Sequence, residues 1–143
     1  MHECPIVDAH VHLWDPEHFR MSWLDGEAAL NKPFGPVEFQ EHSAGLKIEA
    51  FVFVETGLEP HYAALEPDYV VGLAQQESRI KGIVAAAPLE HGECVRSFLK
   101  ALIKAGTLVK GVRRLTQGEP DAGFCLRPDF VHKTCGACHL FTP

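Results

Sequence analysis

The sequence has neither a long apolar run nor a concentration of positive charge. None of its apolar stretches reaches the roughly 20 residues that a membrane-spanning helix needs. Basic residues occur at most in pairs such as Arg113 and Arg114, and the formal net charge is −6. This distribution argues against a nucleic-acid or anionic membrane surface, so we expect a small-molecule partner.

The sequence also lacks the features expected of an exported, disulfide-bonded protein. The first residues show no basic segment followed by a long apolar stretch, so we expect no export signal and a cytoplasmic location. An odd number of cysteines then favours reduced thiols. These five residues are Cys4, Cys94, Cys125, Cys135 and Cys138.

What is present suits one folded domain. A chain of 143 residues with 46% hydrophobic and 22% charged residues can bury a core, which excludes a disordered protein. Short apolar runs alternate with amphipathic stretches along it. The runs predict strands at residues 5–13, 49–56, 80–89 and 108–115. The amphipathic stretches predict helices at residues 35–47, within 60–76, at 92–106, and from 127–131 onward.

Four β-α units in succession predict the α/β class with a parallel sheet, because parallel strands need a helical crossover. A dinucleotide-binding sheet would need a glycine-rich turn after its first strand, and residues 8–17 contain no glycine. A (β/α)8 barrel instead gathers its chemistry at the carboxyl ends of the strands. Polar residues occur at those ends: His10 and His12, Glu55, and Arg113 and Arg114.

His10 and His12 are the first candidates for a functional site. Side chains at i and i+2 of a strand share a face, so both imidazoles project together, with Asp8 one step behind. Such a pair can hold one metal ion or one oxygen-rich ligand. The alternative is a pair of polar residues on the exposed side of a half-buried strand.

Arg113 and Arg114 are adjacent, so they point to opposite faces and only one can enter a pocket. Its planar fork would suit a carboxylate or sugar oxygens, and the alternative for either arginine is a surface salt bridge. Trp14, just past the histidines, either walls the pocket or belongs to the core.

Several segments together resemble a known family. "VDAHVHLWDP", "WL", "FVFVE", "IVAAAPLE" and "VKGVRRLTQ" are similar to the amidohydrolase-related (amidohydrolase 2) branch of the metal-dependent hydrolase superfamily. Within that branch the sugar-lactone and dicarboxylate-lactone hydrolases look most similar. The resemblance implies a distorted (β/α)8 barrel of roughly twice this length, of which this chain would be the N-terminal half. Residues 1–132 would then be a partial domain, and residues 133–143 an unrelated tail without regular structure.

The resemblance implies hydrolysis of a small lactone, with His10 and His12 as the catalytic residues. Substrate contacts would come from Trp14, Glu55, Arg113 and Arg114. Two roles stay open for the histidines: ligands of a divalent metal such as zinc, with Glu55 as a third ligand, or metal-free contacts to the substrate carbonyl. The family's catalytic aspartate would belong to the second half, so we expect no activity from this form alone.

Two alternatives to a lactonase remain. One is a zinc-dependent decarboxylase of the same superfamily. The other is a non-catalytic, truncated isoform that binds metal or a partner, for which the motif "CGACH" is the basis. Cys135 and Cys138 with His132 or His139 could form a zinc site, whereas haem attachment lacks the export signal it would need. In either case the open edges of a half barrel favour self-association.

Overall fold

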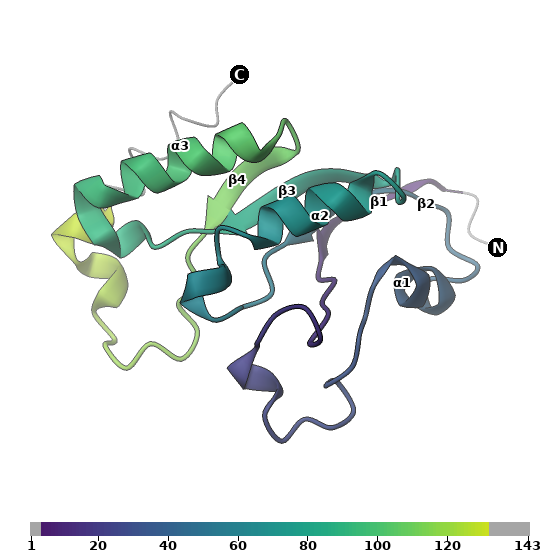
Figure 1. Ribbon diagram of the computed structural model, residues 1–143, viewed down its shortest axis with the longest axis horizontal. Coiled ribbons are helices and arrows are strands. Elements are labelled where there is room, and N and C mark those ends of the chain that lie inside the picture. The colour runs from purple at the N-terminus through teal and green to yellow at the C-terminus, as the bar shows by residue number, and fades with distance from the viewer. Residues whose placement is uncertain (1–3, 132–143) are drawn as a thin grey trace.

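The computed structural model describes residues 4–131. Its centre is a four-stranded parallel sheet in which each strand pairs with the next one along the chain, in the order β1–β2–β3–β4 (Figure 1). The strands are β1 (Ile6–Val11), β2 (Ile48–Val54), β3 (Ile80–Ala86) and β4 (Val109–Arg113). The predicted α/β class with a parallel sheet is confirmed.

A helix follows each of the first three strands. These helices are α1 (Pro36–His42), α2 (Glu66–Ala74) and α3 (Val95–Ala105). Short 3₁₀ helices lie at Ser22–Leu24, Pro60–Tyr62, Leu89–Cys94 and Phe124–Leu126. In Figure 1, α2 and α3 lie side by side over the same face of the sheet. Phe39 of α1 packs against Phe51 of β2, with ring centroids 4.7 Å apart, so α1 covers that face as well.

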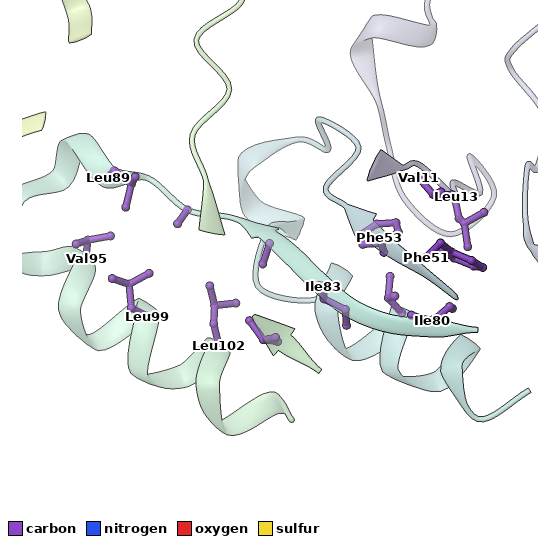
Figure 2. Packing of buried hydrophobic residues seen from close by; sticks show 14 residues of the cluster. Val11, Leu13, Phe51, Phe53, Ile80, Ile83, Leu89, Val95, Leu99 and Leu102 are labelled. Atoms are coloured by element: carbon purple, nitrogen blue, oxygen red, sulfur yellow. The ribbon is translucent and has the colours of Figure 1, made fainter. Parts of the chain in front are cut away.

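The core lies between the sheet and these helices because the strands alternate their side chains. Phe51 and Phe53 are fully buried on the helix side, whereas Val52 between them is only partly buried. On α3, Val95, Leu99 and Leu102 recur at helical spacing, and Figure 2 shows them pointing from the helix toward the sheet. Each buried leucine contributes about 1.5–3 kcal/mol relative to an exposed one.

The predicted elements exist, but most are shorter than predicted. The helix expected over residues 35–47 ends at His42, and Gly45 adopts a left-handed φ of 87° that turns the chain into β2. The helix expected over 92–106 starts at Val95, because Gly92, at φ 59°, kinks the chain before it. The stretch within 60–76 divides into a 3₁₀ turn and α2. Residues 128–131 are helical, as predicted.

Some predictions fall partly or wholly outside the described residues. The boundary at residue 132 and the tail 133–143 do so, and with them Cys135, Cys138 and the two histidines of the second zinc hypothesis. Cys4, Cys94 and Cys125 are free, exposed thiols. Within residues 4–131, none of the helices combines the length and apolar character that crossing a membrane requires.

Candidate functional site

A cavity of about 840 Å³ opens at the carboxyl ends of the strands. This is the end at which (β/α)8 barrels place their chemistry. Five of the six predicted site residues line it, together with a second tryptophan and the loop that follows β4. The lining residues are His10, His12, Trp14, Ser22, Trp23, Glu55, Thr56, Gly57, Arg113, Leu115, Gln117 and Gly118. Of those predicted, His10, His12, Glu55, Arg113 and Trp14 are therefore brought together.

His10 and His12 share a face, as their spacing predicts. Their Nε2 atoms lie 3.1 Å apart, and the rings meet edge to face at 72°. His12 Nδ1 lies 2.8 Å from the carbonyl oxygen of Val54 in the neighbouring strand. Because a carbonyl only accepts, Nδ1 of His12 is the donor and its Nε2 directs a lone pair toward His10 when the ring is neutral. Asp8 accepts a hydrogen bond from the His10 backbone N–H at 3.0 Å, which stabilises the end of β1.

The spacing of the two imidazoles fits part of a metal site. Zinc–nitrogen bonds of about 2.0–2.1 Å in tetrahedral geometry place two ligand nitrogens roughly 3.3 Å apart, close to the separation observed here. The bond from His12 Nδ1 to Val54 is also the kind of second contact that orients a ligating histidine. Among residues 4–131, however, no group of three or more His, Cys, Asp or Glu side chains could hold an ion.

The prediction of Glu55 as a third ligand is therefore wrong for the described part of the chain. Its carboxylate is occupied: Oε1 accepts from Arg113 Nε at 2.7 Å, and Oε2 accepts from the Gly57 N–H at 2.7 Å. The Glu55 side chain is only 2% exposed. The positive charge of Arg113 compensates the buried Glu55 carboxylate, and Arg113 Nη2 also donates to the Glu55 carbonyl oxygen at 2.9 Å. Glu55 thus orients Arg113 at the cavity that both residues line.

Arg113 and Arg114 diverge, as adjacent residues at a strand end must. Arg113 is 27% exposed and lines the cavity beside the histidines. Arg114 turns away to bind Glu90, with Nε 2.9 Å from Oε1, and Glu119, and it lies over the Phe124 ring. It lines an adjoining cavity of about 650 Å³ and is absent from the lining of the first. The structure thus brings one arginine, not both, to the histidine pair.

Two tryptophans form one wall of the cavity. Trp14 and Trp23 meet edge to face with ring centroids 5.8 Å apart. Each indole N–H is satisfied: Trp14 donates to the Leu30 carbonyl at 3.1 Å, and Trp23 donates to the Thr56 carbonyl at 2.8 Å. Trp23 belongs to the segment "WL" that contributes to the family resemblance, but it was not predicted as a site residue. Nothing local in its long connection indicates that its side chain folds back over the strand ends.

Thr56 and Glu66 were also missed. The Glu66 carboxylate is buried, with 3% exposure, and its Oε1 accepts from Thr56 N at 3.0 Å and Thr56 Oγ1 at 2.6 Å. Burial raises the pKa of Glu66 to about 7, against the two hydrogen bonds from Thr56, which lower it. The available signal for Thr56 was its place directly after Glu55 at a strand end. Glu66 gave none, because an acidic residue in the first turn of a helix is usually solvated.

Sequence comparisons find no relatives, whereas structural comparison finds several. No model of a known protein family matches the chain, and no curated protein matches it. Amidohydrolase 2 from Bifidobacterium longum subsp. infantis is similar in structure, with a TM-score of 0.71 and 18% identity over 97% of this chain. An amidohydrolase from Burkholderia multivorans with bound zinc has a TM-score of 0.70 and 20% identity over 93% of this chain. The same protein with bound HEPES has a TM-score of 0.72 and 21% identity over 93% of this chain.

The chain spans about half the length of these structures: 49% of the Bifidobacterium protein and 45% of each Burkholderia chain. At such low identity the likeness shows the fold. The four parallel β-α units thus correspond to part of an amidohydrolase barrel, which is the predicted fold class.

Proposed function

We propose that residues 4–131 supply the first half of the active site of an amidohydrolase-related hydrolase that acts on a small lactone. The histidine pair is the observation that supports this most: two Nε2 atoms 3.1 Å apart, at the carboxyl end of β1, face a cavity that Arg113 also lines. The similar structures are named amidohydrolases, and one of them holds zinc. A cytoplasmic location is part of the same proposal.

The chemistry follows from what a lactone carbonyl needs. Attack by water places negative charge on the carbonyl oxygen, and the group that stabilises this charge lowers the barrier. A divalent ion held by His10 and His12, with further ligands from outside the described residues, would supply a Lewis acid. In a metal-free site, the Nε2 proton between the two rings would be donated to that oxygen instead. Arg113 would bind a carboxylate or ring oxygens of the substrate, and Trp14 would wall the pocket.

Water activation requires a base, which the described cavity does not offer. Glu55 is the only carboxylate among its lining residues, and both of its oxygens are engaged. Loss of a general base costs about 10²- to 10⁴-fold in rate. We therefore expect the 143-residue chain to show no lactonase activity above background.

A chimera tests the proposal. Residues 4–131 are joined to the remaining half of the similar Burkholderia multivorans protein, and a panel of sugar and dicarboxylate lactones is followed with a pH indicator. We expect measurable turnover from the chimera and its loss in His10→Ala and His12→Ala, with His42→Ala, an exposed histidine on α1, as the control. Comparable turnover by the 143-residue chain alone would show that the catalytic base lies within it.

Metal binding is tested on the chain itself. Equilibrium dialysis with zinc should show weak binding, because two imidazoles provide fewer ligands than a stable site requires. We expect the His10→Ala/His12→Ala variant to lose this binding and the Cys135→Ser/Cys138→Ser variant to keep it. The opposite pattern would favour the metal-binding, non-catalytic alternative and would assign the zinc to the cysteines.

A zinc-dependent decarboxylase is the second candidate, supported by the zinc in one similar structure. The two reactions differ in product. A decarboxylase would release carbon dioxide from a carboxylic acid, whereas lactone hydrolysis opens a ring and releases a proton. Measurement of carbon dioxide from the chimera with aromatic acids therefore separates the two, and its detection without lactone turnover would replace the lactonase proposal.

A further inference from the structure

Residues 55–57, directly after β2, make hydrogen bonds to two side chains that line the cavity, Arg113 and Trp23. Arg113 is bonded to the side chain and the carbonyl of Glu55. The Trp23 indole donates to the carbonyl of Thr56 at 2.8 Å. Gly57, at φ 69°, turns back so that its N–H donates to Glu55 Oε2. A shift of this short segment would therefore move the guanidinium and the indole together.

Behind the segment, away from the cavity lining, lies Glu66. It is the first residue of α2 and does not line either cavity, so it has no direct contact with a ligand there. Its Oε1 accepts from both the backbone N–H and the hydroxyl of Thr56, at 3.0 Å and 2.6 Å. Hydrogen bonds to an ionised carboxylate are shorter and roughly twice as strong as neutral ones. The pair thus fastens the middle of the segment to α2.

We propose that Glu66 is a positioning residue of the cavity: it holds Thr56, and through residues 55–57 it sets the positions of Arg113 and Trp23. The inference concerns the wall of the cavity and does not depend on lactone hydrolysis.

The protonation state of Glu66 then affects the positions of the side chains in this wall in the neutral pH range. The pKa of Glu66 is raised to about 7, chiefly by burial and to a smaller extent by the negative charge of Glu55. The two bonds from Thr56 and the positive charge of Arg113 act in the opposite direction. Protonation weakens the bonds that Thr56 donates, since the acceptor loses its charge. The contact between Thr56 and Trp23 should loosen as pH falls through this value.

Tryptophan fluorescence reports on this wall selectively. The chain contains two tryptophans, Trp14 and Trp23, and both line the cavity. Titrating the 143-residue chain without ligand, from about pH 5 to about pH 9, should show a change in emission with a midpoint near 7. We expect Glu66→Gln, which keeps the shape and removes the titration, to abolish this change. Thr56→Val removes a hydrogen bond that lowers the pKa, so its midpoint should move upward.

Matched variants exclude the other titrating groups. Asp68→Asn alters an exposed carboxylate in the same first turn of α2 and should leave the midpoint unchanged. His10→Ala/His12→Ala should keep the transition, which separates Glu66 from the histidines beside Trp14. An emission change that persists in Glu66→Gln, or that disappears with the two histidines, would overturn the proposal. If Glu66→Gln does not fold, the midpoint of Thr56→Val decides. A midpoint that does not move upward in this variant would contradict the proposal.

Discussion

At the scale of single residues, the ion pair between Glu55 and Arg113 combines a buried carboxylate with a partly exposed guanidinium. The side chains are 2% and 27% exposed, and Arg113 Nη2 lies 2.6 Å from Glu55 Oε1. Removing one partner of a buried pair leaves an uncompensated charge, which costs about 3–5 kcal/mol. Arg113→Met should therefore lower the free energy of unfolding, measured with urea, by roughly 3 kcal/mol.

The same measurement on related variants shows whether the cost comes from the orphaned charge. Glu55→Gln combined with Arg113→Met should recover part of the loss, because no unpaired carboxylate remains. Lys47 and Glu49 form an exposed pair with 56% and 53% side-chain exposure, and Lys47→Met should change stability by less than about 1 kcal/mol. Equal losses in Arg113→Met and Lys47→Met would mean that the Glu55 carboxylate is well solvated.

Glu66 makes stability depend on pH. Its pKa is about 7 in the folded chain against an ordinary value of 4.5, so between these values the folded state binds more protons than the unfolded state. Stability from this group is therefore present below about pH 4.5 and is lost as pH rises to about 7. Glu66→Gln should reduce the difference in unfolding free energy between pH 5 and pH 8 by roughly 2 kcal/mol. Asp68→Asn should leave this difference in unfolding free energy unchanged. If Glu66→Gln also left it unchanged, Glu66 would titrate near its ordinary pKa.

At the scale of elements, α3 is held to the sheet by its apolar face. Leu99 is 2% exposed and points toward the sheet in Figure 2, whereas Ile103, one turn further along, is 38% exposed. Leu99→Ala removes buried methyl groups and leaves a cavity, so we expect a loss of about 2–5 kcal/mol in calorimetric or urea unfolding. Ile103→Ala should cost less than about 1 kcal/mol. A similar loss for both would mean that the outer face of α3 is also covered.

At the scale of the whole molecule, the sheet has two edges. Within residues 4–131, β1 pairs only with β2 and β4 only with β3, so one side of each is available to another chain. Val7 on β1 is 66% exposed. Exposed, unpaired strands associate readily. Light scattering should therefore detect dimers or larger assemblies of the 143-residue chain.

A charge on the edge strand tests which surface is responsible. Val7→Lys should reduce association, because charged side chains on edge strands oppose pairing. Val37→Lys, at an equally exposed valine of α1 (65%), is the matched control and should leave association unchanged. A cooperative, monodisperse wild-type monomer would contradict the prediction.

The sequence by itself determined the features that depend on local periodicity. Alternation and helical spacing placed the strands and the main helices, with errors mainly at their ends, where Gly45 and Gly92 change the backbone direction. The period of two also put His10 and His12 on one face and sent Arg113 and Arg114 apart. These results need only neighbouring residues, which is why they could be predicted.

Tertiary structure alone decided which side chains of the site contact one another. Arg113 binds Glu55 from 58 positions away and thereby removes it from the set of metal ligands. Trp23 and Glu66 reach Thr56 from a long connection and from a helix start. Such contacts depend on how the packed sheet and helices bring distant segments together, and on which polar groups burial then forces to pair. No local pattern in the sequence indicates which distant segments meet or which buried polar groups pair.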